Sequence, residues 1–336
     1  MTNKTNIRLT ASEIAALWVQ YQNNTLVSCV FKYLISNNGD NSIREILKFA
    51  ITLSQEHLRF VRDIFPREDF AIPIGFTDSD VNINAENLFG DCFALHYLDN
   101  MSRLAVAAYG LALCNATRSD IRDFYKQAVI DAMKINEKAV QLMLEKGIYN
   151  RPPSIPPSKT VQFAKKQGFL GSLLTEMRPL TSVEIMNLFN NIQTNIMGKA
   201  MMTAFSQVAA SPEFRDYFLR GKEIARKHID IFSEKLSQDD LNGCLPIEPL
   251  ITSSTQAPFS DKLMMFHTTA LVQAGIGNYG LSISTIQRYD LAIDYARLMT
   301  EIGVFAKDGA NIMIDKGWFE EPPQAVNRKE LAMSHH

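Results

Sequence analysis

The residues of this chain best suited to chemistry are histidines and acids that recur at matching places in its two halves. The matched residues are His57, His96 and Asp131 in the first half and His228, His267 and Glu301 in the second, with Gln22 and Gln193 as further polar members. Neutral imidazole and carboxylate oxygens are ligands that suit Fe, Mn or Zn. The sequence therefore predicts a candidate metal site in each half, made of two imidazoles and one carboxylate.

The matching of these residues follows from an internal repeat. Residues 9–14 (Leu-Thr-Ala-Ser-Glu-Ile) return as residues 180–185 (Leu-Thr-Ser-Val-Glu-Ile), and Tyr109-Gly110-Leu111 returns as Tyr279-Gly280-Leu281. A period of roughly 170 residues has the size of a domain and is far longer than a solenoid unit. The chain is therefore predicted to be a tandem duplication of one domain.

Apolar residues at helical spacing, interrupted by turn residues, predict four helices in each half. They cover residues 10–36, 42–65, 85–115 and 117–147 in the first half and 181–210, 212–236, 258–286 and 288–316 in the second. At the start of each fourth helix, an arginine is predicted to pair with the aspartate two positions later, Arg118 with Asp120 and Arg288 with Asp290. No run of alternating β-branched residues is present, so we expect no sheet.

The second connection of each half, residues 66–84 and 237–257, is long enough to run from one end of a bundle to the other. Such a crossover makes the second and third helices parallel, as in ferritin-like folds. The predicted fold is thus all-α, with two tandem ferritin-like four-helix bundles. The predicted parts are residues 1–150, a Pro-rich linker at 151–179 with a short docking helix at 161–177, residues 180–325 and a tail at 326–336.

A helix rise of about 1.5 Å per residue places one of the matched polar residues of each helix near the middle of the bundle. Besides a metal site, these residues suit a hydrogen-bonded layer that fixes helix register, or a small-ligand pocket between the helices. A di-iron site needs Glu-x-x-His on two helices. The residues three before His57 and His228 are Ser54 and Ala225, which disfavours ferroxidase and oxygenase chemistry.

Composition narrows the function classes. The formal net charge of -2 argues against a nucleic-acid partner. The longest apolar stretch, residues 104–114, is too short to span a membrane, and the first six residues lack the apolar core of a signal peptide. The four cysteines have no paired spacing, which is typical of reduced thiols. We therefore expect a cytoplasmic protein. His335 and His336 are left out of the candidate site.

Several longer stretches resemble a known family. They are residues 178–181, 191–195, 217–223, 258–267 (Pro-Phe-Ser-Asp-Lys-Leu-Met-Met-Phe-His), 275–280 and 308–311. Together they are similar to domain-of-unknown-function family 3231, tandem ferritin-like proteins common in endospore-forming bacteria. The resemblance covers essentially the whole chain and implies the duplicated bundle. It implies no established activity.

The leading hypothesis for function is a non-catalytic structural or interaction protein, associated with spores, that assembles with itself or with a protein partner. The alternative is a metal-binding bundle with a His/His/carboxylate site in each half. This alternative includes a redox-active protein. A carrier of a small apolar ligand is the third hypothesis. Metal content at stoichiometric level separates the second hypothesis from the other two.

Overall fold

The computed structural model describes residues 7–165, 167–171 and 177–333, which form an all-α structure of two halves. The first half contains α1 (Ala11–Asn37), α2 (Asn41–Arg67), α3 (Phe93–Asn115) and α4 (Ser119–Glu145). The second contains α5 (Ser182–Val208), α6 (Pro212–Ser237), α7 (Asp261–Thr285) and α8 (Tyr289–Asp315), followed by the short α9 (Arg328–Met333). The predicted pattern of four long helices per half is confirmed.

The repeated motif at the start of each half is a capping box. The Thr10 side chain accepts a hydrogen bond from the backbone N–H of Glu13, and the backbone N–H of Thr10 donates to the Glu13 carboxylate. Thr181 and Glu184 form the same pair of bonds at the start of α5. Both glutamates are almost fully buried. Each also accepts backbone N–H groups at the start of the fourth helix, from Arg118 in the first half and from Arg288 in the second. One carboxylate thus caps two helices, which explains why the motif occurs in both halves.

The fourth helices begin and end as the sequence predicts. Arg118 donates two hydrogen bonds to Asp120, of 2.8 and 2.7 Å, and Arg288 donates two to Asp290, of 3.0 and 2.8 Å. After the last turn, Gly147 has a φ of 69° and Gly317 one of 68°. Glycine adopts this left-handed conformation without steric cost, so it ends the helix cleanly.

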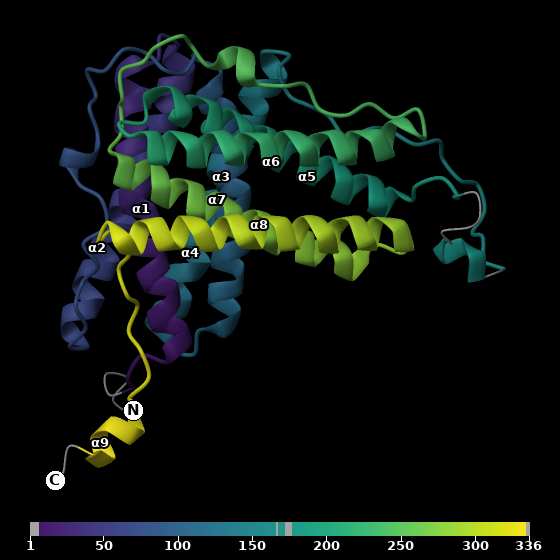
Figure 1. Cartoon of the computed structure of the whole chain (residues 1–336). Coiled ribbons are helices and arrows are strands. Elements are labelled where there is room, and N and C mark those ends of the chain that lie inside the picture. Colours follow the sequence, from purple (N-terminus) through teal and green to yellow (C-terminus); the bar gives the residue numbers. More distant parts are fainter. Residues whose placement is uncertain (1–6, 166, 172–176, 334–336) are drawn as a thin grey trace.

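The helices of one bundle run across those of the other (Figure 1). In each half a long crossover returns along the bundle before the third helix begins, so the second and third helices run in the same direction. One core of buried residues extends through both bundles, and a second is confined to the outer half of the first bundle. In the described residues the helices therefore form two bundles with a shared interior.

The two crossovers pair with each other through an approximate two-fold relation. Asn82 N–H donates to the carbonyl of Pro258 over 2.8 Å, and the equivalent Thr252 N–H donates to the carbonyl of Leu88 over 3.0 Å. Only isolated bridges are formed, so the expectation of no sheet agrees with the described residues. The pairing also explains a wrong boundary: α3 begins at Phe93 rather than near residue 85, because the preceding residues belong to the paired crossover.

Each half also holds the crossover of the other by a residue that follows its fourth helix. The side chain of Asn150 accepts a hydrogen bond from the backbone N–H of Leu245 over 3.2 Å. At the equivalent place in the second half, the Glu320 carboxylate accepts the N–H groups of Ile74 and Gly75, both over 2.8 Å. The two bundles are thus clamped reciprocally.

The linker differs from its prediction. Residues 161–165 have no regular secondary structure and are exposed, and Phe163 is 84% exposed, so this part of the predicted docking helix does not dock. A single 3-10 turn follows at Gln167–Leu170. Residues 166 and 172–176 of the predicted helix lie outside the described residues. Gly168 and Gly171 oppose a regular helix here.

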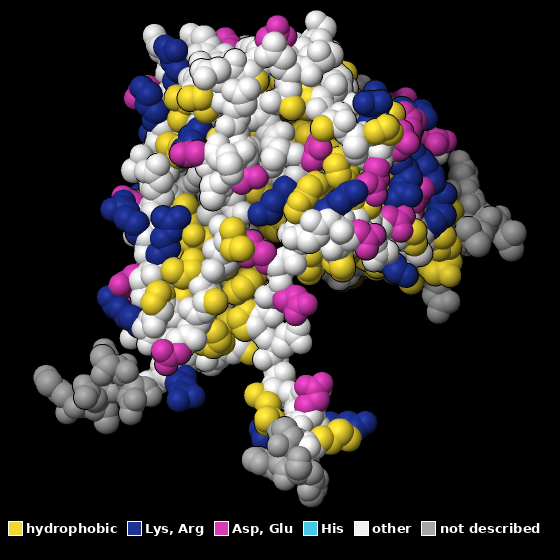
Figure 2. Space-filling model, turned by 60° about the vertical axis from the view of Figure 1, so that its left-hand side comes forward, with side chains coloured by type: hydrophobic (Ala, Val, Ile, Leu, Met, Phe, Trp, Pro, Cys, Tyr) yellow, Lys and Arg dark blue, Asp and Glu magenta, His cyan; other side chains and the backbone are white. Residues whose placement is uncertain are grey.

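The surface in Figure 2 carries both charged and apolar side chains. None of the described helices is long and apolar enough to cross a membrane. Apolar side chains gather on the part of the first bundle that projects beyond the second (Figure 2). Exposed apolar residues on the first bundle include Val19 of α1, Leu111 of α3 and Met133 of α4.

Candidate functional site: a polar layer in each bundle

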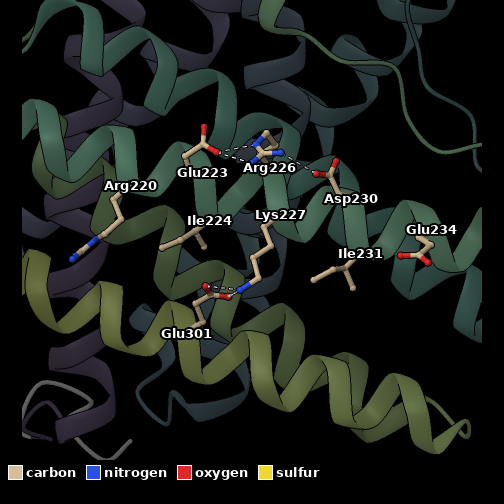
Figure 3. A pocket seen from close by; sticks show the side chains of 9 residues that line it. All are labelled: Arg220, Glu223, Ile224, Arg226, Lys227, Asp230, Ile231, Glu234 and Glu301. Atoms are coloured by element: carbon tan, nitrogen blue, oxygen red, sulfur yellow. Dashed lines mark hydrogen bonds and ion pairs between the residues drawn. The ribbon is translucent and has the colours of Figure 1, made fainter.

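In the second bundle, His228 of α6 is the centre of a buried polar layer. Its side chain is fully buried, its Nδ1 lies 2.8 Å from the Tyr279 hydroxyl, and its Nε2 lies 3.2 Å from Glu301 Oε2. Lys227 Nζ donates to both carboxylate oxygens of Glu301, over 2.8 and 2.9 Å. Figure 3 shows Lys227 reaching from α6 across the groove to Glu301 on α8. Both ring nitrogens and both carboxylate oxygens therefore have protein partners.

The layer continues through two asparagines of α5. Asn195 donates to the Tyr279 hydroxyl over 2.8 Å. One turn earlier, Asn191 donates to Ser282 Oγ over 2.8 Å and to the Tyr295 hydroxyl over 3.1 Å. These bonds connect α5 with α7 and α8, so a change in helix register would break several of them together.

Electrostatics keeps the imidazole neutral and the acid ionised. Burial lowers the pKa of His228, and the hydrogen bond to Glu301 only partly opposes this. Burial acts to raise the pKa of Glu301, but the hydrogen bonds from Lys227 and His228 outweigh it and hold the pKa below its usual value. The ammonium of Lys227 therefore neutralises the carboxylate in this layer.

The first bundle contains the same plan with fewer bonds. His57 Nε2 lies 4.0 Å from Asp131 Oδ2, and neither ring nitrogen of His57 has a hydrogen-bond partner, although the residue is only 8% exposed. The ring packs edge-on against Tyr109 and Phe124. Burial lowers the pKa of His57, against the opposing effect of Asp131 and Glu56. His57 is thus a buried imidazole with unused hydrogen-bonding capacity.

A second part of this layer is also incomplete. The hydroxyl of Tyr125 and the side-chain amide of Gln20 are buried and have no partner. Their equivalents in the second bundle, Tyr295 and Asn191, are hydrogen-bonded to each other. Alanine stands at position 112, where the second bundle has Ser282. The two copies have therefore diverged in how completely their polar groups are satisfied.

The other two candidate histidines lie at the boundary between the bundles. His267 is 2% exposed, and its Nε2 lies 3.2 Å from the hydroxyl of Tyr97 of α3. His96 lines a cavity of about 30 Å³ between α3 and α5. Burial lowers the pKa of both histidines, that of His267 to about 3. The structure thus joins His57 with Asp131 and His228 with Glu301, and leaves His96 and His267 away from these pairs.

The structure places the two glutamines of the predicted site in different surroundings. The Gln193 side chain accepts a hydrogen bond from Arg103 of α3 over 2.8 Å, so it belongs to the boundary between the bundles. Gln22 is buried on α1. Within the part of the chain that the structure describes, no group of three or more His, Cys, Asp or Glu side chains is arranged to hold a metal ion.

Sequence reasoning overlooked the tyrosine that connects each layer. Tyr279 bonds both His228 and Asn195, and its counterpart Tyr109 packs against His57. Both tyrosines begin the Tyr-Gly-Leu motif that is repeated in the two halves. The repeat itself was the signal that could have identified them.

Comparison with known proteins places the chain in a family. A family model described as a protein of unknown function, DUF3231, matches residues 1–161 and again residues 168–331. The chain belongs to the DUF3231 family. Among curated proteins none matches. This DUF3231 chain is similar to the solved structure of a putative spore coat protein (BH2358) from Bacillus halodurans C-125, with 16% identity and a TM-score of 0.42 over 46% of this chain and 100% of that chain.

Two hollows occur beside the second layer of this DUF3231 protein. A groove of about 410 Å³ between α6 and α8 is lined by charged side chains over Ile224 and Ile231 (Figure 3). A cavity of about 70 Å³ inside the bundle is bordered by Gly198, Gly221 and Tyr279. This cavity is well below the ~150 Å³ of an engineered cavity that holds benzene, so it offers little room for the small apolar ligand considered from the sequence.

Proposed function

We propose that this DUF3231 protein is a non-catalytic structural or interaction protein, in which the polar layers fix the register of the helices. One observation carries the proposal: in the second bundle, both ring nitrogens of His228 and both oxygens of Glu301 are bonded to other side chains. Since one ring nitrogen donates to Glu301 and the other accepts from Tyr279, the neutral imidazole of His228 has no free lone pair for a metal or substrate.

A pair of variants tests the structural role of this layer. Glu301→Leu alone strands the His228 Nε2 and the Lys227 ammonium, and we expect the free energy of unfolding to fall by about 1–3 kcal/mol. The double variant His228→Leu/Glu301→Leu removes both partners of the bond between α6 and α8, and we expect it to regain part of that loss. Urea unfolding followed by circular dichroism measures both. A double variant that is no more stable than Glu301→Leu would contradict the proposal.

We propose further that the protein acts in association with spores and through assembly, with itself or with a protein partner. The family resemblance supports the spore association, and the apolar side chains on the outer part of the first bundle support assembly (Figure 2). A fluorescent fusion expressed from its own promoter tests the first part. We expect it in the spore fraction of sporulating cells; a fusion that is expressed in sporulating cells but absent from the spore fraction would contradict it.

The second candidate function is metal binding, with redox activity as one version, and a specific observation favours it for the first bundle. His57 keeps both ring nitrogens unbonded, 4.0 Å from a carboxylate oxygen of Asp131. Neutral imidazole and carboxylate suit Fe, Mn or Zn. Elemental analysis of protein purified without chelators tests it, with His57→Ala as the control. A metal content near zero, even after incubation with metal salts, would reject this candidate.

A further inference from the structure

The groove between α6 and α8 is open at a place that aromatic side chains fill in the first bundle. Between α2 and α4, the rings of Phe60 and Phe124 stack with their centroids 4.0 Å apart and an interplanar angle of 5°. Their counterparts in the second bundle are Ile231 and Asp294. Because the second bundle lacks this pair of rings, a groove of about 410 Å³ remains, with the half-buried Ile231 at its floor.

The size of this groove suits apolar side chains that enter from outside. Figure 3 shows Ile224 and Ile231 reaching from α6 toward α8, with the ion pair of Lys227 and Glu301 between them. An engineered cavity of ~150 Å³ holds benzene. A groove of about 410 Å³ can therefore accept a phenyl ring together with a neighbouring side chain.

The linker of the same chain carries an exposed segment with such side chains. Residues 159–165 (Lys-Thr-Val-Gln-Phe-Ala-Lys), which we call the docking segment, have no regular secondary structure. Val161 is 86% exposed and Phe163 is 84% exposed. Figure 1 shows the linker running outside the end of the second bundle that is farther from the first. Because their own chain leaves these two apolar side chains uncovered, they are available to a second copy.

Charge also favours this pairing. The docking segment contains two lysines and no acid. The groove is lined by four acids and three bases, and each of the three bases is bonded to an acid of the same chain. Glu234 lines the groove one helical turn after Ile231, on the same face of α6. A lysine of the docking segment can therefore pair with Glu234 when an apolar side chain packs on Ile231.

We propose that the docking segment of one molecule inserts Phe163 into the groove between α6 and α8 of a second copy, where the ring packs on Ile231. Val161 lies two residues earlier and therefore on the same side of an extended segment. The inference rests on the proposed function, because it supplies a contact for the assembly of this protein with itself. Since the segment and the groove are different surfaces, the contact is heterologous and repeats into chains or rings.

Two variants of the full chain remove the two sides of the contact separately. Phe163→Ser removes the ring, and Ile231→Phe/Asp294→Phe places the aromatic pair of the first bundle in the groove. Lys235, a partner of Asp294, keeps its ion pair with Asp290 in the second variant. Sedimentation over a range of concentrations measures the mass of the assemblies. We expect the unchanged protein to exceed its monomer mass of 37.9 kDa. Each variant should weaken self-association by at least about 30-fold, as the loss of an anchor residue does at an interface.

Mixing the two variants tests the contact between copies. One variant supplies an intact groove and the other an intact docking segment, so we expect the mixture to form a dimer although neither variant associates alone. A mixture that stays monomeric would overturn the proposal, and it is the result expected if the segment occupied the groove of its own chain. Ile155→Ser in the linker and Ile314→Phe on α8 change exposed residues outside the contact, and both controls should assemble like the unchanged protein.

Folding of each variant is checked by circular dichroism. Because the side chain of Phe163 is exposed, monomeric Phe163→Ser should keep the helix content of the unchanged protein. Self-association that persists undiminished in Phe163→Ser would overturn this inference and leave the assembly of the protein with itself intact. An unchanged protein that stays monomeric at every concentration would overturn both.

Discussion

The buried side chain of His267, at the boundary between the bundles, should make the free energy of unfolding depend on pH. Burial lowers the pKa of His267 from 6.5 to about 3. The folded protein therefore keeps this ring neutral, while the unfolded chain takes up a proton below about pH 6.5. The stabilisation is fully present above that pH and is lost progressively as the pH falls from about 6.5 toward 3. We expect His267→Gln, which keeps an oxygen to accept from Tyr97, to remove this dependence.

The size of the effect follows from the pKa difference. Each pH unit below the unfolded-state pKa costs about 1.4 kcal/mol for a ring that stays neutral when folded. Between pH 7 and pH 5 the loss due to His267 is therefore about 2 kcal/mol, because the first half unit has little effect. Since the ring is fully buried, solvent screening does not reduce this figure.

Urea unfolding at pH 7 and pH 5 measures the difference directly. The loss of stability between the two pH values should be smaller in His267→Gln than in the unchanged protein by about 2 kcal/mol. Tyr97→Phe is the control, because it removes the hydroxyl but leaves His267 buried, so it should keep the original pH dependence. Equal losses in His267→Gln and in the unchanged protein would refute the reasoning.

Three further changes test other parts of the structure. Tyr279→Phe leaves His228 Nδ1 without its partner and should lower the free energy of unfolding by about 1–3 kcal/mol in urea titrations. Glu320→Ala releases two backbone N–H groups of the first crossover, so limited proteolysis should cut there faster than in the unchanged protein. Gly221→Ala places a Cβ 2.7 Å from a phenylalanine ring carbon and should destabilise by about 1–3 kcal/mol, whereas Gly303→Ala, which meets open space, should stabilise by up to about 1 kcal/mol.

The helices and the duplication were predictable because they depend on local pattern and on repetition within the chain. The inward positions of His57 and His228 also followed, since each lies on an apolar stripe of its helix. The pairing of Arg118 with Asp120 depends on residues two positions apart, and the structure confirms it. The crossover pairing could not be predicted, because it joins irregular segments that are distant in the sequence.

The expected match between His96 and His267 fails for a geometric reason. Asp69 and Asp240 share a left-handed φ and are 171 positions apart, but the crossover pairs that follow, such as Asn82 and Thr252, are 170 apart. One crossover is therefore a residue shorter, and the counterpart of His267 is Tyr97 rather than His96. One residue turns a helix position by about 100°, so the two histidines that looked equivalent occupy different faces.

The contact between Tyr97 and His267 has a consequence for how such a fold can vary. These two residues occupy the same position of the two copies, and they touch each other where the approximate two-fold axis passes. In a dimer of identical subunits, a residue on the axis must pair with itself, which limits it to self-complementary types. Covalent fusion lifts that limit: a phenol and an imidazole, one suited to donate and the other to accept, face each other at a position that identical subunits could not make different.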